Sequence, residues 1–276
     1  MKILILGASS YVGARLYFDL QKDFEVVGTY SSNKLSEKLI HLDVTNEDQV
    51  ASVIETVKPD VIVHVANSAD SRWCEANPQE AYKLNETSST YIVDAANTIG
   101  VKIIYISSFA AMVPENVYSK TKKESEEIVK QTKNGWVILR PSLIVGYSPN
   151  TTNDRPFNRF LKNIDEGTQA EYDTSWKFQP TWLGHISEVI KLVLQRNIDG
   201  KIISIVVPEL KTRYDLAKDF LTPFNVVVTS IDKHDATPVI EDDLETLKKL
   251  DLPMYFYKEI VSKIVGEIRE RDKYKL

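Results

Sequence analysis

The chain has 276 residues, of which 43% are hydrophobic, enough to bury the core of one large domain or of two closely joined ones. Its net charge of −5 argues against the basic face that nucleic-acid binding requires, so no nucleic-acid partner is expected. A single cysteine, Cys74, a short apolar start and the lack of a run of about 20 apolar residues lead us to expect a cytoplasmic protein with neither signal peptide nor membrane span.

Short apolar runs alternate with helical patterns through the first half of the chain. Gly100 is expected to end the third helix. Strands that are apolar throughout and alternate with helices predict an α/β fold, with a doubly wound parallel sheet of the Rossmann type. The predicted strands are 2–6, 24–30, 38–44, 60–66, 101–108 and 135–142, and the predicted helices are 11–22, 46–57, 78–99 and 116–133.

The alternation changes after about residue 146. We predict a dinucleotide-binding domain over 1–145, with 179–206 packing on it, and a smaller substrate-binding lobe from 146–178 and 207–276. Helices are predicted at 155–166, 185–196, 213–221, 242–250 and 255–271, with strands at 201–207 and 224–231.

The stretch "GASSYVG" lies between the first strand and the first helix. Gly7 suits a tight turn and Gly13 a close approach of helix and strand, so backbone N–H groups would face a pyrophosphate. Ser10 stands where a glycine is expected; it adds a Cβ, and its hydroxyl is a candidate donor to the phosphate. The alternative is a strand, turn and helix without a ligand. The predicted contacts are Gly7, Ser9, Ser10, Tyr11, Val12 and Gly13.

The end of the second strand bears on the choice of cofactor. A carboxylate there would bind the ribose hydroxyl of NAD, but "TYSSNK" carries none. Its side chains favour a 2′-phosphate, and hence NADP(H), with NAD(H) possible and an ordinary polar loop as the alternative. Asp43 and Val44, after the third strand, are placed to meet the adenine, although Asp43 is equally suited to capping the next helix. The candidates before Asp43 are Tyr30, Ser31, Ser32 and Lys34.

The stretch "YISSFAAMVPENVYSKTKKESEEIV" places a hydroxyl, a phenol and an ammonium near one another. Tyr118 and Lys122 share a helix face, and Ser107 and Ser108 end the neighbouring strand at the edge where α/β sites lie. Reduction of a ketone needs a hydride from nicotinamide and a proton for the oxygen. A tyrosine can supply that proton if a nearby ammonium lowers its pKa from about 10. The alternative is a chance pattern on a solvated helix.

With these motifs in order, the chain resembles extended short-chain dehydrogenases/reductases, most closely the dTDP-4-dehydrorhamnose (RmlD-like) reductases. Further similarity lies in "KPDVIVHVANSADSRWCEANPQEAYKLNETSS", "VILRPS" and "FQPTWLGHISEVI". The resemblance implies Tyr118 as acid, Lys122 as its partner and Ser108 as the oxygen-binding hydroxyl, with Ser107 a lesser candidate. Ala66, Asn67 and Asn85 are then expected at the cofactor, and Ser68, Ser108, Arg140, Leu143 and Gln179 at the substrate.

Several positions depart from that family. Only nine residues separate Ser108 from Tyr118, where about twenty are usual, and Leu143 replaces an aromatic residue. The resemblance implies a reductase of a keto group on a nucleotide-activated sugar, and a homodimer is common in the superfamily. Two alternatives stay open: a nucleotide-sugar epimerase, and a non-catalytic NADP-binding subunit resembling the methionine adenosyltransferase beta subunit. Further pocket candidates are Tyr147, Asn153, Arg155, Trp176 and Thr181; no histidine pair has metal-ligand spacing, so no metal is expected.

Overall fold

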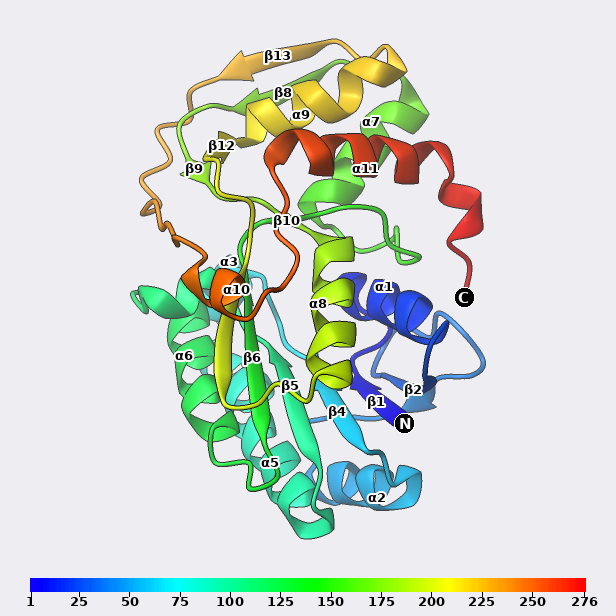
Figure 1. Ribbon diagram of the computed structural model, residues 1–276. Helices are drawn as coiled ribbons and strands as arrows, with labels where there is room; N and C mark the ends of the chain where they lie inside the picture. Colours follow the sequence, from blue (N-terminus) through cyan, green and yellow to red (C-terminus); the bar gives the residue numbers. More distant parts are fainter.

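A computed structural model describes residues 1–276, and a seven-stranded parallel sheet forms its centre (Figure 1). The order across the sheet is β11-β6-β5-β4-β1-β2-β3, so the chain starts in the middle and winds outward both ways. The predicted doubly wound fold is confirmed. The strands are β1 (Lys2–Leu6), β2 (Glu25–Tyr30), β3 (Ile40–His41), β4 (Val61–His64), β5 (Lys102–Ile106), β6 (Trp136–Pro141) and β11 (Lys201–Ile205).

Helices cover both faces of this sheet, which explains why the central strands β1, β4 and β5 carry apolar side chains toward both faces. Leu4 and Leu6 of β1 pack with residues of α2 (Glu47–Val57) and α5 (Ser88–Ile99). Ile3 and Ile5 point the other way and pack with α1 (Tyr11–Leu20) and α8 (Leu183–Gln195). Successive side chains of a strand point to opposite faces, so both faces of β1 must be apolar.

Some predicted elements of the first half differ from those observed. The helix predicted over 78–99 consists of α4 (Pro78–Tyr82), a π-helical turn η1 (Lys83–Thr87) and α5, which ends at Gly100 with a φ of 75°. The strand predicted at 38–44 pairs only over the two residues of β3. The sequence analysis missed α3 (Ser71–Ala76) and the 3-10 turn η2 (Phe109–Met112), which are too short for a periodic pattern. The helix predicted at 116–133 is α6 (Val117–Val129).

The second half builds a group of elements at one end of the sheet, at the top of Figure 1. It contains the predicted α7 (Pro156–Glu166), α9 (Arg213–Leu221), α11 (Tyr257–Arg269) and β13 (Val228–Ile231). Short strands that were not predicted join it: β8 pairs with the predicted β13, β12 pairs with β9, and β10 pairs with β7. The remaining elements are β7 (Ile144–Val145), β8 (Ala170–Asp173), β9 (Lys177–Phe178), β10 (Thr181–Trp182), β12 (Lys211–Thr212), α10 (Glu245–Lys249), η3 (Thr222–Phe224) and η4 (Arg271–Lys273).

A buried ion network joins α1, near the start of the chain, to α11, near its end. Arg15 is 4% exposed; its Nε donates to Asp19 at 2.6 Å and its Nη2 to Glu267 at 2.7 Å. The other Glu267 oxygen accepts the Tyr147 N–H at 2.8 Å. One hydrophobic core also runs from Ile3 to Ile268, so the domain division near residue 145 stays a prediction. No helix combines the length and apolar character needed to cross a membrane.

Candidate active site

The glycine loop joins β1 to α1 at the carboxyl edge of the sheet. Gly7 has a φ of 88°, and a Cβ there would lie 3.0 Å from the Ala66 backbone. A Cβ on Gly13 would lie 2.1 Å from the Gly7 carbonyl oxygen, so both positions require glycine. The loop thus offers an open backbone cradle at a helix N-terminus, which fits the pyrophosphate of a dinucleotide.

Ser10 caps α1, a role the sequence analysis did not anticipate. Its Oγ accepts the Gly13 N–H at 3.0 Å, and its backbone is extended, as an N-cap requires. The N–H groups of Tyr11 and Val12, in the same first turn, point along the helix axis toward the cradle. The serine therefore stabilises the helix start while its hydroxyl hydrogen stays free to donate.

A loop from the second half of the chain supports the glycine loop from behind. The side chain of Asn150 donates to the Ser9 carbonyl at 2.7 Å, and the Ser148 hydroxyl donates to the Tyr11 carbonyl at 2.6 Å. The Tyr11 hydroxyl donates in turn to the Gly146 carbonyl at 2.5 Å. Because these partners are more than 130 positions away, no local pattern reveals them.

The residues predicted for the adenosine end lie at the carboxyl ends of β2 and β3. Ser31 and Ser32 are exposed, and Lys34 forms an exposed 2.5 Å ion pair with Glu37, which raises its pKa. Asp43 accepts the Thr45 N–H at 2.9 Å and hydroxyl at 2.8 Å, and these bonds lower its pKa. Asn46, not Asp43, caps α2, which leaves Asp43 at the edge where an adenine is expected.

Ser108 and Tyr118 lie beside the glycine loop, and Lys122 lies one helical turn after Tyr118 on α6. Ser108 and Tyr118 line the same cleft as Ser10, Tyr11 and Val12, and the Ser108 hydroxyl lies close enough to the phenol to lower its pKa. Tyr118 lies in the first turn of α6, and Lys122 follows one turn later. The Lys122 ammonium donates to the Ile106 carbonyl at 2.8 Å and lies 4.2 Å from the Tyr105 ring centroid.

Burial governs the protonation of both groups. It raises the pKa of Tyr118, while the nearby Ser108 hydroxyl and the positive charge of Arg155 oppose that rise. Burial lowers the pKa of Lys122 to about 7, against the attraction of Glu126. A lysine with a pKa near neutral, one helical turn from a half-buried tyrosine on the same face of α6, is suited to general acid–base chemistry.

The choice between Ser107 and Ser108 follows from their hydrogen bonds. Ser107 is buried and donates its only hydroxyl proton to Glu126 at 2.6 Å. Ser108 accepts the Ala110 N–H at 3.2 Å and keeps its proton for a substrate oxygen. This supports Ser108 as the oxygen-binding hydroxyl.

Asn85 lies in the π-helical turn and braces the loop after β4. Its Oδ1 accepts the Ser68 N–H at 2.7 Å and its Nδ2 donates to the Ser68 carbonyl at 3.0 Å. Asn85 is fully buried, and Asn67, next to Ser68, lines the cleft. Asn85 and Ser68 therefore position the loop rather than line the cleft; Ala66 packs under Gly7.

The cleft has a volume of about 440 Å³ and widens outward into a hollow of about 930 Å³. Leu143, Arg155 and Trp176 line it as predicted. The sequence analysis missed Arg213, whose guanidinium lies 5.0 Å from the Trp176 ring centroid. Both arginines, with Pro156, line cleft and hollow alike; other unpredicted lining residues are Phe109, Phe178, Pro238 and Ile240.

Two residues predicted to contact substrate are engaged elsewhere. The Arg140 guanidinium forms a two-bond ion pair with Glu126, at 2.8 Å and 2.5 Å. Gln179 is buried, donates to the Pro208 and Asp242 carbonyls and accepts the Asp242 N–H at 2.8 Å. Neither lines the cleft, so both predictions are corrected: these side chains hold the framework around the cleft. Thr181 is similarly occupied with Ser142 and Ile205.

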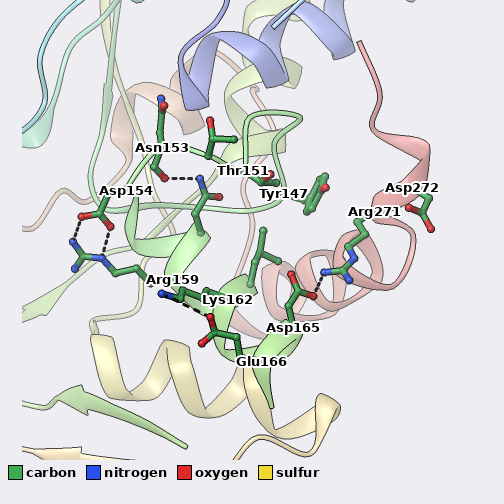
Figure 2. A pocket seen from close by; sticks show the side chains of 13 residues that line it. Tyr147, Thr151, Asn153, Asp154, Arg159, Lys162, Asp165, Glu166, Arg271 and Asp272 are labelled. Carbon is green, nitrogen blue, oxygen red and sulfur yellow. Dashed lines mark hydrogen bonds and ion pairs between the residues drawn. The ribbon is translucent and has the colours of Figure 1, made fainter. Parts of the chain in front are cut away.

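A further hollow of about 600 Å³ lies beside α7 and η4 (Figure 2), and it shares Asp154, Arg159, Lys162 and Glu166 with the 930 Å³ hollow. Tyr147 and Asn153, predicted for the substrate pocket, line this hollow and not the cleft. It shares no lining residue with the cleft that holds Ser108 and Tyr118, so we do not assign it to the active site. Its ion pairs are Arg159–Asp154, Arg271–Asp165 and Lys162–Glu166.

The doubly wound sheet, the glycine loop and the Ser-Tyr-Lys group define an extended short-chain dehydrogenase/reductase. Residues 1–239 match the RmlD substrate binding domain, and the chain belongs to that family. It is 30% identical to dTDP-4-dehydrorhamnose reductase of Escherichia coli over 52% of each chain. It is 24% identical to methionine adenosyltransferase 2 subunit beta of Xenopus laevis over 82% of this chain and 72% of the relative. The crystal structure of the Bacillus anthracis dTDP-4-dehydrorhamnose reductase in complex with NADP superposes with a TM-score of 0.81 over 96% of this chain and 99% of the other, at 19% identity.

Proposed function

We propose that this protein is an NADP(H)-preferring reductase that acts on a keto group of a nucleotide-activated sugar. The observation that carries the proposal is the position of Tyr118 beside Ser108 in a cleft that begins at the glycine loop. An NAD(P)-dependent oxidoreductase needs a proton donor beside the nicotinamide, and this cleft supplies one. The family relatives named dTDP-4-dehydrorhamnose reductase support the same reaction class.

Each catalytic side chain has a role in the reduction. The bound dinucleotide supplies the hydride. Ser108 donates a hydrogen bond to the substrate carbonyl oxygen and orients it, while Tyr118 gives that oxygen its proton. The Lys122 ammonium favours the phenolate left behind, because a nearby positive charge lowers the cost of the negative one.

The outer cleft suits a nucleotide diphosphate. Arg155 and Arg213 place two guanidinium groups at the junction of cleft and hollow. One guanidinium can donate two parallel hydrogen bonds to two oxygens of a phosphate group. Trp176 offers an aromatic face for a base or a sugar ring. The segment between Ser108 and Tyr118 is shorter than is usual in the family, and Leu143 replaces an aromatic residue. The wall of the inner pocket therefore differs from that of the family's usual pocket, which suits a different sugar.

NADP preference is the finer part of the proposal. The absence of a carboxylate at the end of β2 and the ammonium of Lys34 favour a 2′-phosphate. Lys34 is exposed and paired with Glu37, so it must leave that partner to bind the phosphate. A cytoplasmic location and a homodimer also stay predictions.

The decisive experiment combines cofactor binding with turnover. NADPH and NADH are titrated into the purified chain by calorimetry, and NADPH oxidation is followed with a panel of nucleotide-activated ketosugars. Tyr118→Phe should lower turnover by about 100-fold or more, since it removes the proton donor, and should leave the NADPH Kd unchanged. Full activity in Tyr118→Phe would refute the assignment.

The same experiment separates two other functions. Turnover without net oxidation of NADPH, with the cofactor retained, would indicate an epimerase. The similarity to methionine adenosyltransferase 2 subunit beta favours a regulatory subunit as the second candidate. NADPH binding with no turnover of any ketosugar, together with recovery of a bound methionine adenosyltransferase in a pull-down, would support that candidate.

A further inference from the structure

A buried carboxylate lies one helical turn beyond Lys122. Glu126 of α6 is fully buried and accepts two hydrogen bonds from Arg140, on β6. A third comes from the Ser107 hydroxyl at 2.6 Å. The carboxylate is thus held in one orientation, and its partners come from two strands of the sheet.

A buried ion pair at this position is a poor way to stabilise the fold. Removing two charges from water is expensive, and apolar side chains of similar volume often serve a core as well or better. Hydrophobic residues of the neighbouring strands lie on the same face of the sheet as Glu126, with Tyr105 and Ile138 both buried. A charged pair retained there points to an effect on a neighbouring charge.

Lys122 and Glu126 form hydrogen bonds with two consecutive residues, Ile106 at the end of β5 and Ser107 directly after it. The Lys122 ammonium holds the Ile106 carbonyl at 2.8 Å, and Glu126 holds the Ser107 hydroxyl. Ser108, the hydroxyl assigned to the substrate oxygen, follows directly. One face of α6 therefore sets both the strand end that carries Ser108 and the ammonium that serves Tyr118.

We propose that Glu126 is a positioning residue of the active site: its anchored carboxylate keeps the Lys122 ammonium charged and, through Ser107, holds the strand end that presents Ser108. The inference deepens the proposed function, on which it relies for the role of Lys122. Arg140 orients the carboxylate and reduces its net charge, so its own effect on Lys122 has the opposite sign.

The other groups around Lys122 leave Glu126 as its negative neighbour. His64, on β4, is buried with a pKa of about 3 and is neutral. Tyr105, on β5, presents its ring to the ammonium, and burial raises its pKa, so it is neutral too. Arg155, from the start of α7, acts on Tyr118.

The test measures the titration of Lys122 directly by NMR of isotope-labelled lysine side chains, assigned with Lys122→Met. Glu126→Gln keeps the shape and most hydrogen bonds but removes the charge, and should lower the pKa of Lys122 by about 1 or more. Glu127→Gln removes the same charge from the exposed side of α6 and should leave that pKa unchanged. Equal titration of Lys122 in wild type and folded Glu126→Gln would overturn the proposal.

Arg140→Gln gives a second test with the opposite sign and keeps the proposal falsifiable should Glu126→Gln fail to fold. It removes a positive charge and retains the carboxylate, so the pKa of Lys122 should rise; an unchanged or lowered value would overturn the proposal. Where a substrate turns over, the alkaline limb of the pH–rate profile should move to lower pH in Glu126→Gln. Because the NMR titration needs no substrate, its outcome is independent of whether the proposed reaction is found.

Discussion

Replacing Glu267 by Gln tests how strongly the buried ion network joins the two ends of the chain. One oxygen of Glu267 accepts Arg15 at 2.7 Å and the Trp182 indole N–H at 3.0 Å, and the other accepts the Tyr147 N–H at 2.8 Å. Glutamine has nearly the same shape, but it carries no charge and its amide nitrogen cannot accept a hydrogen bond. One of these donors therefore loses its acceptor.

The expected cost is a fraction of that of a fully broken buried pair. Removing one partner of such a pair costs about 3–5 kcal/mol, because the remaining charge is left uncompensated. Arg15 retains Asp19 at 2.6 Å, so its charge is still partly neutralised. We therefore expect the free energy of unfolding to fall by about 2–3 kcal/mol.

Guanidinium denaturation followed by tryptophan fluorescence measures this change. The matched control is Glu270→Gln in the turn after α11, where the side chain is 58% exposed and pairs with Lys273 at 2.8 Å. Loss of that surface pair should change the free energy of unfolding by about 0.5 kcal/mol or less. If Glu267→Gln costs no more than its control, the network does not hold the C-terminal helix to α1.

Two further predictions concern the glycine loop and the segment over the cleft. Ser10→Ala should lower the free energy of unfolding by about 1 kcal/mol, because the Gly13 N–H loses the oxygen that caps it, whereas Ser10→Gly should lower it by only a few tenths of a kcal/mol. Equal stability of Ser10→Ala and wild type in denaturation would disprove the cap. NADPH titration of both variants shows whether the hydroxyl also contacts the cofactor: weaker binding by Ser10→Gly indicates a contact, and tighter binding a steric compromise. Gln179→Ala removes both main-chain bonds to Asp242 and should speed proteolytic cleavage within 236–241 about tenfold, with NADPH affinity retained. Unchanged cleavage, mapped by mass spectrometry, would show that Gln179 does not restrain this segment.

Local patterns in the sequence determined the fold class and the centre of the site. The apolar run of β1, the glycines at 7 and 13 and the following helix occupy one short stretch, so their geometry depends on neighbours in the chain. Tyr118 and Lys122 share a face because of helical spacing alone. Sequence reasoning was therefore sufficient to place the phenol and the ammonium at the carboxyl edge of the sheet.

Contacts between distant segments decided the rest. Ser107 and Ser108 are equivalent in sequence, and only the hydrogen bond from Ser107 to Glu126 distinguishes them. The sequence likewise does not show that Arg140 is bonded to Glu126 and Gln179 to Asp242, so neither is available to a substrate. The strands β7, β9, β10 and β12 are two residues long, which is too short for an alternating hydrophobic pattern, and each is defined only by the strand with which it pairs. Arg15 meets Glu267 across 252 positions, so its role depends on packing that no local pattern can encode.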